Sequence, residues 1–274
     1  MTGPGVLLRR YGLAPRKAWG QNFLHDRTIV ARIVEHVPGP RVVEIGAGLG
    51  ALTAPLCDRG LEVHAIERDR DLVRVLRREL GDRPNLSIHE ADAVRFAYDL
   101  PDHPGPPPCV AGNLPYHLTG PLLFRLLEHH EATGPWIVMV QREVGDRLLA
   151  APGGRTFGAS TVSIGRVRRV ERLFAVPRGA FLPPPRVDSV VVRLTPRPTP
   201  LAAVSDPAAF PRFVQRVFQG RRKRVANALA FAGDRAAVRA ACAAAGVDPT
   251  LRCEALSVEA FARLFEHLHG QAHA

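Results

Sequence analysis

Cysteine is scarce in this chain, and the four cysteines present follow no metal-binding or disulfide pattern. Cys57, Cys109, Cys242 and Cys253 include no C-x-x-C pair and no regularly spaced framework. A zinc ribbon and a small disulfide-bonded scaffold are therefore excluded, and a reducing compartment suits these residues.

Long apolar runs are missing as well. No run approaches the roughly 18 apolar residues that a membrane-spanning helix requires. The segment from Met1 to Arg10 lacks the apolar core of a signal peptide. We therefore expect a soluble protein of the cytoplasm.

Acidic residues are in the minority. Aspartate and glutamate together number 26 against 37 arginines and lysines, which gives a formal net charge of +11 over 274 residues. A surplus of this size points to a polyanionic partner such as nucleic acid. The alternative is a soluble protein whose surface is rich in arginine because its genome is rich in GC. The length allows one large domain, or one medium and one small domain.

Segments typical of strands alternate with segments typical of helices in the first half of the chain. This order predicts a parallel, doubly wound sheet, in which ligands bind at the carboxyl ends of the strands. The strands are expected at 41–45, 61–66, 86–89, 109–111 and 137–140.

Four polar or glycine-rich features fall at such strand ends: Gly46 to Gly50, Glu67, Asp92 and Asn113. Glycines let backbone N–H groups approach a ligand closely, and an acid about 20 residues later can hold ribose hydroxyls. Asp92 could accept a hydrogen bond from an adenine amino group, or it caps a turn. The pattern predicts a nucleoside ligand and allows NAD, FAD or S-adenosylmethionine.

The stretch from Gly112 to Tyr116 carries the chemistry that we expect. Pro115 fixes its own φ and biases Leu114 away from the helical region, so the amide of Asn113 should point out of the turn. An amide oxygen, a peptide carbonyl and a tyrosine ring together suit a planar base with an exocyclic amino group. Accepting its hydrogens localises the nitrogen lone pair and makes the nitrogen nucleophilic. A purely structural turn is the alternative.

The C-terminal part of the sequence is richer in proline and alanine. Two strands are expected at 170–176 and 187–194, and the proline-rich loop between them presents Phe181 either at the edge of a site or in the core. Four further helices are expected at 208–219, 221–232, 234–245 and 257–268. The predicted organisation is a basic, poorly ordered arm (1–18), a ligand-binding domain (19–195), a Pro-rich linker (196–207) and a helical domain (208–274).

The basic run Arg221-Arg222-Lys223 opens the second of these C-terminal helices. Cations in a first turn oppose the helix dipole unless an anion lies there, so a phosphate backbone would stabilise them. A solvated charged face is the alternative. The tail histidines His267, His269 and His273 are typical of a frayed polar end, and we expect no metal site.

Several motifs follow one another in the order found in one enzyme family. They are Gln21-Asn22-Phe23-Leu24, Glu44-Ile45-Gly46-Ala47-Gly48, Asn113-Leu114-Pro115-Tyr116, Phe181-Leu182-Pro183-Pro184-Pro185-Arg186-Val187-Asp188-Ser189 and Arg221-Arg222-Lys223. With these motifs in register, the chain from about residue 15 to about residue 265 resembles the ribosomal RNA adenine N6-dimethyltransferases, and most of all their small-subunit branch.

The resemblance implies a class I methyltransferase fold, which is Rossmann-like, with a seven-stranded sheet ending in a reversed strand and a small C-terminal helical domain. It implies S-adenosylmethionine as cofactor. It also implies N6-dimethylation of two adjacent adenines in the 3′-terminal hairpin of small-subunit (16S) ribosomal RNA, within a subunit precursor. We expect a monomer without a membrane partner.

The resemblance also assigns roles to single residues. Asn113 and the carbonyl of Leu114 would receive the target amine, while Tyr116 and Phe181 would stack on the flipped base. The run Arg221-Arg222-Lys223 would bind RNA. The residues implied for the cofactor site are Gln21, Asn22, Leu24, Gly46, Gly48, Glu67, Asp92 and Asn113.

Three alternatives fit part of the pattern. A dimethyltransferase of the antibiotic-resistance type acts on large-subunit RNA and usually has Ile where Leu114 stands; the Arg-Arg-Lys run and the long C-terminal domain favour the small-subunit enzyme. An assembly factor could keep the fold and bind RNA without turnover, but the intact Asn113, Tyr116 and Glu67 favour an enzyme. An NAD-dependent oxidoreductase would need a nicotinamide site that the sequence does not reveal.

Overall fold

The computed structural model describes residues 2–100 and 105–269, and the chain divides into two compact units. The first unit runs to Gly145 and includes Val170–Pro196, and the second combines Asp146–Arg169 with the chain from Arg197 onward. The predicted ligand-binding domain, 19–195, thus includes a segment, 146–169, that packs with the C-terminal helices. The predicted linker also falls almost wholly inside the second unit.

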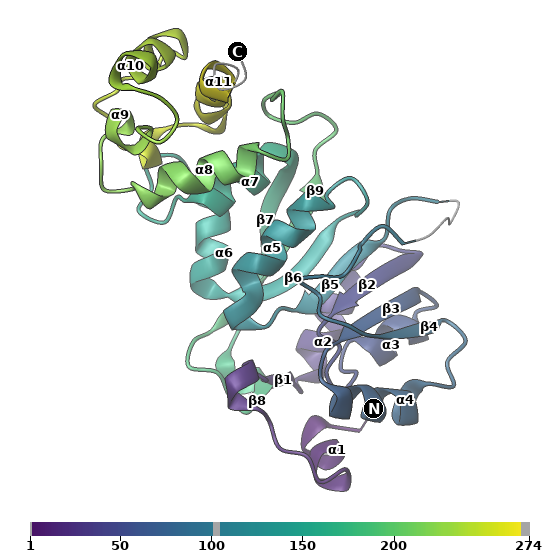
Figure 1. Cartoon of the computed structure of the whole chain (residues 1–274). Coiled ribbons are helices and arrows are strands. Elements are labelled where there is room, and N and C mark those ends of the chain that lie inside the picture. Colours follow the sequence, from purple (N-terminus) through teal and green to yellow (C-terminus); the bar gives the residue numbers. More distant parts are fainter. Residues whose placement is uncertain (1, 101–104, 270–274) are drawn as a thin grey trace. The chain divides into compact units, whose positions relative to one another are not determined.

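A seven-stranded sheet forms the centre of the first unit (Figure 1). Its strands lie in the order β4-β3-β2-β5-β6-β9-β7, and the pairs from β4 to β6 are parallel, whereas β9 runs antiparallel to β6. The prediction of a Rossmann-like sheet with a reversed last strand is confirmed. The strands are β2 (Arg41–Ile45), β3 (Glu62–Glu67), β4 (Leu86–Glu90), β5 (Cys109–Asn113), β6 (Trp136–Gln141), β7 (Arg168–Val176) and β9 (Ser189–Pro196).

Helices connect these strands, and local sequence explains where they begin. Asp26 accepts hydrogen bonds from the N–H groups of Thr28 and Ile29 and so caps the first turn of its helix. Asp69 caps the next long helix in the same way, through the N–H group of Asp71. The helices of this unit are α2 (Arg27–His36), α3 (Thr53–Asp58), α4 (Arg70–Leu80), α5 (Thr119–Glu128) and α6 (Arg142–Leu148), the last of which ends in the second unit.

The N-terminal segment is ordered, which corrects the prediction of a poorly ordered arm. Helix α1 (Pro4–Arg10) buries Leu7 and Leu8 in a cluster with Leu49 and Leu72. Apolar burial of this kind holds a short helix that its own hydrogen bonds could not stabilise. The sequence-based prediction considered only the basic residues of this segment and missed the contribution of Leu7 and Leu8 to the core.

A small second sheet joins two motifs that lie far apart in the sequence. Strands β1 (Phe23–Leu24) and β8 (Phe181–Leu182) pair antiparallel, with Leu24 opposite Phe181. The N–H group of His25 extends this pairing by donating to the carbonyl of Ala180 at 2.9 Å. The proline-rich loop therefore holds the Gln-Asn-Phe-Leu motif in place.

The second unit is helical and has its own core. Its helices are α7 (Ala159–Val167), α8 (Phe210–Gln219), α9 (Val225–Ala228), α10 (Arg235–Ala244) and α11 (Val258–His269). The predicted helix at 221–232 is wrong in length, because α9 has only four residues and the basic run lies in the turn before it. Within residues 2–100 and 105–269, no helix has both the length and the apolar character needed to cross a bilayer.

Candidate active site

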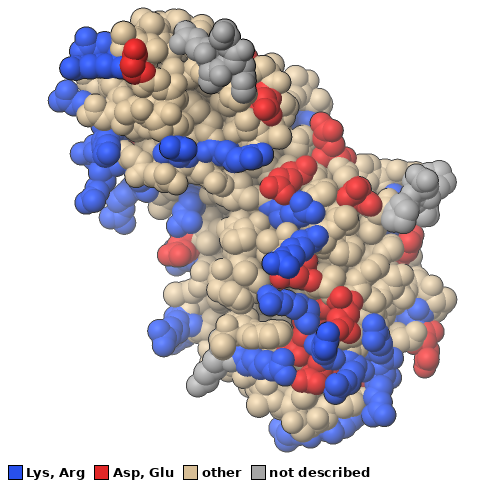
Figure 2. Space-filling model, viewed as in Figure 1, with Lys and Arg blue, Asp and Glu red and all other residues tan. Residues whose placement is uncertain are grey.

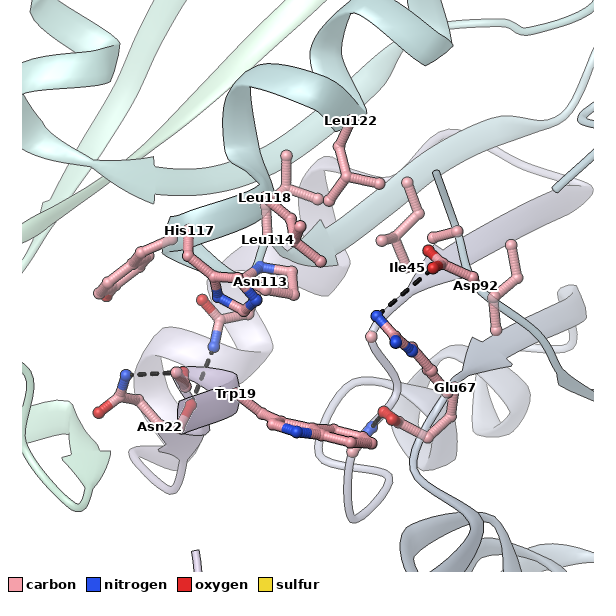
Figure 3. A pocket seen from close by; sticks show the side chains of 18 of the residues that line it. Trp19, Asn22, Ile45, Glu67, Asp92, Asn113, Leu114, His117, Leu118 and Leu122 are labelled. Atoms are coloured by element: carbon pink, nitrogen blue, oxygen red, sulfur yellow. Dashed lines mark hydrogen bonds and ion pairs between the residues drawn. The ribbon is translucent and has the colours of Figure 1, made fainter. Parts of the chain in front are cut away.

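A cavity of about 330 Å³ opens at the carboxyl ends of the central strands (Figure 3). The ends of β2, β3 and β5, the loop after β4 and the segment before β1 all contribute to its wall. The sequence-predicted residues that line it are Asn22, Gly46, Gly48, Glu67, Asp92, Asn113, Leu114 and Tyr116.

The glycine turn after β2 forms one side of the cavity. Gly46, Gly48 and Gly50 have φ values of +70°, +58° and +83°, a region that other L-residues rarely adopt. With no side chains at Gly46 and Gly48, the backbone itself faces the cavity. A ligand can therefore approach these peptide groups closely.

Glu67 ties the end of β3 to this turn. Its Oε2 accepts the N–H of Gly48 at 2.9 Å, and its Oε1 accepts the N–H of Asp69 at 2.8 Å. Burial raises the pKa of the Glu67 carboxyl, and the bonds from backbone N–H groups oppose that rise. Each oxygen keeps a second acceptor position, so the carboxylate can still take hydrogen bonds from the hydroxyls of a ribose.

Asp92 faces the same cavity from the loop after β4, but it is already partly engaged. Its Oδ1 accepts the N–H of Val94 at 3.0 Å, and its Oδ2 lies 3.4 Å from Nη1 of Arg68. Figure 3 shows Asp92 at the border of the cavity, with a dashed line at its carboxylate that marks an ion pair. Asp92 therefore caps a turn and also offers a remaining acceptor position on the cavity side.

Asn113, the last residue of β5, presents an amide whose orientation is fixed by its neighbour. Its Nδ2 donates to the main-chain carbonyl of Asn22 at 3.1 Å (Figure 3). A carbonyl can only accept, so the NH2 group must face Asn22 and Oδ1 must face away from it. This Oδ1 is buried and has no hydrogen-bond partner among the described residues. A buried acceptor without a donor is destabilising, and a ligand amine would satisfy it.

Gly112 lets β5 approach β2 closely enough to place Asn113. A Cβ at position 112 would overlap the carbonyl oxygen of Ile45. One residue after Asn113, the N–H of Leu114 donates to the carbonyl of Met139 at 3.1 Å and extends the pairing of β5 with β6. The turn is therefore held on both sides by the sheet.

Tyr116 closes the cavity beside this turn. Its hydroxyl lies 2.6 Å from Oγ of Ser189 on β9, and burial raises the pKa of the phenol. The hydrogen bond anchors the far end of the ring and leaves a ring face beside the cavity. The sequence-based prediction included Tyr116 but not the anchoring role of Ser189.

Three residues predicted for the catalytic and cofactor sites lie outside this cavity. Phe181 is only 2% exposed and packs in the hydrophobic core, so its ring lies away from the cavity in this structure and its stacking on a base stays a prediction. The side chain of Gln21 is used by the protein, because Nε2 donates to Asp69 at 2.7 Å and Oε1 accepts from the N–H of Arg16 at 2.8 Å. Leu24 lines an adjoining cavity.

That adjoining cavity measures about 300 Å³ and lies on the other side of the glycine turn. It shares Asn22, Phe23, Gly46, Gly48 and Asn113 with the first, so an elongated ligand could contact both. Glu44 of β2 also lines it, and its buried Oε2 has no hydrogen-bond partner within the described chain. Burial raises the pKa of the Glu44 carboxyl to about 7.

Trp19 is the most prominent lining residue that sequence reasoning missed. The residue is 37% exposed, and it borders the cavity near Glu67 (Figure 3). The guanidinium carbons of Arg16 and Arg68 lie 5.1 and 5.3 Å from the ring centre, within cation–π range. The available signal was its position just before the Gln-Asn-Phe-Leu motif, in a chain with two tryptophans.

The residues present suit a nucleoside cofactor rather than a metal ion. A buried strand-end carboxylate beside a side-chain-free turn matches ribose binding, and apolar Ile45, Ile66 and Leu122 offer surface to a planar base. Across residues 2–100 and 105–269, no group of three or more His, Cys, Asp or Glu side chains is placed to hold a metal.

Comparison with known proteins agrees with this geometry. A family model described as ribosomal RNA adenine dimethylase matches residues 12–269. The chain is 47% identical over 275 residues to the ribosomal RNA small subunit methyltransferase A of Anaeromyxobacter sp. (strain K), covering 95% of this chain and 96% of the relative. It is 40% identical over 268 residues to the protein of the same name from Pseudomonas putida, covering 97% and 99%.

Two solved structures resemble the chain over most of its length. The 23S rRNA methyltransferase ErmE aligns with a TM-score of 0.65 and 30% identity, over 90% of this chain and 100% of that one. A dimethyladenosine transferase from Plasmodium falciparum aligns with a TM-score of 0.71 over 91% and 98%; at 23% identity this likeness shows the shared fold. Given the match of the family model over residues 12–269, the chain belongs to the ribosomal RNA adenine dimethylase family.

Proposed function

We propose that this chain transfers methyl groups from S-adenosylmethionine to N6 of two adjacent adenines in the 3′-terminal hairpin of small-subunit ribosomal RNA. The product would be N6,N6-dimethyladenine, formed during ribosome biogenesis. Relatives with 40 to 47% identity over about 95% of the chain carry a small-subunit methyltransferase name, which supports this choice of RNA. The protein would act as a monomer in the cytoplasm and would bind the RNA as part of a subunit precursor.

The unpartnered Oδ1 of Asn113 is the observation that carries this proposal. An adenine amine has two hydrogens to donate, and Oδ1 with the neighbouring carbonyl of Leu114 would accept them. Such bonds draw the nitrogen out of conjugation with the ring and direct its lone pair. They strengthen as the nitrogen becomes tetrahedral, so they stabilise the transition state more than the ground state.

The cofactor supplies an electrophilic methyl group on a positively charged sulfur. Glu67 would hold the ribose hydroxyls, and Asp92 would accept from the amino group of the cofactor's adenine. The backbone at Gly46 and Gly48, with Asn22 and Leu24 from the adjoining cavity, would hold its amino-acid part. Alignment of donor and acceptor supplies most of the catalysis, because a well-oriented pair reacts as a single molecule.

Tyr116 would hold the extruded adenine by stacking. A base reaches such a pocket only after it leaves its helix, and an aromatic face compensates for the lost stacking. The hydrogen bond between the hydroxyls of Tyr116 and Ser189 restricts the ring, so less conformational freedom is lost on binding. No side-chain base is needed, since the neutral amine already carries the attacking lone pair.

The test is labelled methyl transfer to undermethylated small subunits, beside protein-free large-subunit RNA, with the modified nucleotides mapped. We expect dimethyladenine only in the small-subunit hairpin. Asn113→Ala should abolish transfer while RNA affinity stays within a few-fold, and Gln215→Ala, an exposed amide on α8, serves as the matched control. Full activity in Asn113→Ala would refute the assigned role.

The likeness to the 23S rRNA methyltransferase ErmE supports one alternative function, methylation of large-subunit RNA. A large-subunit enzyme would methylate the protein-free large-subunit RNA and leave the small subunit unmodified. A factor that binds RNA without turnover would modify neither substrate but would still bind small subunits. The same assay with a binding measurement therefore separates all three functions.

A further inference from the structure

The arginines of the first unit are repeatedly paired with carboxylates. Ion pairs at 2.5 to 3.4 Å join Arg10–Glu79, Arg16–Asp69, Arg16–Asp71, Arg68–Asp92, Arg70–Glu90, Arg74–Asp71, Arg83–Asp58, Arg125–Glu128 and Arg193–Glu171. The charges of these eight arginines are therefore balanced locally. Figure 2 shows blue and red side chains interspersed on its visible face.

The second unit has a different charge pattern. In Figure 2 blue side chains gather on its visible edge, over α9, α10 and the turn before α9. Arg235 and Arg239 of α10 are exposed and have no ion pair or side-chain hydrogen bond among the residues that the structure describes. These charges are therefore available to a partner.

Three arginines of the second unit surround one hollow. Arg224, Arg235 and Arg239 line a cavity of about 400 Å³, together with the polar side chains of Asn227 and Thr250. The one carboxylate in its wall, Asp234, already accepts the N–H of Ala237 at 2.8 Å as the cap of α10. A second carboxylate, Asp248, accepts hydrogen bonds from Thr250 and interacts electrostatically with Arg224. Three guanidinium groups against these two carboxylates leave an excess of positive charge at the hollow.

The positions of Arg235 and Arg239 oppose the stability of their own helix. Arg235 is the first residue of α10, where a cation meets the positive end of the helix dipole. Arg239 lies four residues later on the same face, and like charges at that spacing repel. An anion in the hollow would relieve both effects, and the planar fork of arginine suits phosphate.

The residues of the basic run before α9 differ in whether the protein itself pairs their charges. Arg221 is held by the protein, because it pairs with Glu254 at 2.9 Å and donates to the carbonyl of Arg155. The side chains of Arg222 and Lys223 are exposed and have no such contacts within the described chain. The available charges of this unit therefore extend from Arg222 to the hollow.

We propose that the hollow lined by Arg224, Arg235 and Arg239 is a binding site for phosphodiester groups of the RNA backbone. This rests on the proposed function and adds a second contact region to it, separate from the residues that grip the target adenine. Arginine forks would hold phosphate oxygens, and Asn227 could recognise a ribose 2′-hydroxyl, which both donates and accepts. Arg221 acts as a structural residue that fixes the turn.

The experiment measures binding of undermethylated small ribosomal subunits over a series of salt concentrations. The variant Arg235→Ala/Arg239→Ala removes two charges from α10, and alanine favours the helix, so the fold is retained. The matched control Arg77→Ala/Arg78→Ala removes two exposed charges from α4. Arg235→Lys/Arg239→Lys keeps the charges but loses the fork.

Each lost phosphate contact lowers the slope of log affinity against log salt by roughly 0.7 to 0.9. We expect the α10 variant to lose about one to two units of slope, the lysine variant to lose less, and the α4 control to match the parent protein. An unchanged slope in the α10 variant, or an equal loss in the control, overturns the proposal.

Methyl transfer by the unmodified protein, measured on the same subunits, tests the proposed function separately. If the protein binds with the expected slopes but transfers no methyl group, the proposed function fails and the phosphate site stands. If it methylates the small-subunit adenines while the α10 variant keeps the parent slope, only the phosphate site fails.

Discussion

The side-chain amide of Asn113 donates to the main-chain carbonyl of Asn22 at 3.1 Å, across 91 positions of the sequence. This contact joins the strand-end turn to the N-terminal motif and leaves Oδ1 of Asn113 without a donor in the part of the chain that the structure describes. The proposed binding of the target amine depends on this contact.

Asn113→Asp tests the orientation of that amide. The substitution keeps an acceptor but sets a carboxylate oxygen against the Asn22 carbonyl, and the two repel. We expect the single-turnover rate of methyl transfer to fall by roughly 10²- to 10³-fold, the size found when one transition-state hydrogen bond is removed. Labelled transfer at saturating RNA and cofactor checks this, and a rate within three-fold of the parent would contradict it.

Phe181 and Tyr116 should respond differently to substitution. Phe181→Ala removes a core ring and should lower the free energy of unfolding by about 3–5 kcal/mol. Tyr116→Phe loses only the bond to Ser189, about 0.5–1.5 kcal/mol, and frees the ring that is proposed to stack. Denaturant melts and methyl-transfer rates, measured on both variants, compare the effects. A stable Phe181→Ala protein with a selective loss of activity would instead support a stacking role for Phe181.

Trp19 should report on cofactor binding. Trp19 is 37% exposed and lines the cavity, whereas Trp136 is fully buried and hydrogen-bonded to Thr133. We expect S-adenosylmethionine to change the tryptophan fluorescence and Trp19→Phe to remove that change. Trp19→Ala removes the aromatic contact, which is worth about 0.5–1.5 kcal/mol. We therefore expect this variant to bind the cofactor roughly 2- to 13-fold more weakly. An equal fluorescence change in Trp19→Phe would place the cofactor away from this ring.

Glu44 should make stability depend on pH. Burial raises the pKa of its carboxyl in the folded protein from 4.5 to about 7. The folded state therefore binds the proton more tightly than the unfolded chain, and the stability this confers is complete below about pH 4.5 and is lost as pH rises to about 7. The loss is about 1.4 kcal/mol for each unit of pKa difference.

The comparison with Glu44→Gln isolates this effect. The glutamine variant should show a smaller fall in the free energy of unfolding between about pH 4.5 and about pH 7, since its amide does not ionise. Denaturant melts at several pH values check this. Parallel curves for the two proteins would assign the pH dependence to other groups, such as Glu67, whose pKa burial also raises.

The local signals in the sequence were strong enough to predict the sheet and most of the cavity wall. Strand and helix periods, the caps Asp26 and Asp69 and the glycine turn depend on neighbouring residues, and the carboxyl ends of parallel strands always meet at one edge. That rule by itself predicts that Gly46, Glu67, Asp92 and Asn113 lie together, and all four line the cavity.

Only the tertiary structure decided which side chains within a motif reach the cavity and which support it. Phe181 and Gln21 stand in motifs as distinctive as that of Asn113, yet one fills the core and the other bonds to Asp69. Whether a side chain faces a ligand or the protein depends on contacts between segments tens of residues apart, such as β1 with β8 or Tyr116 with Ser189. The composition determines the net charge of the chain. Only the tertiary structure determines which arginines remain available to a partner, because an ion pair such as Arg221–Glu254 neutralises an arginine within the protein.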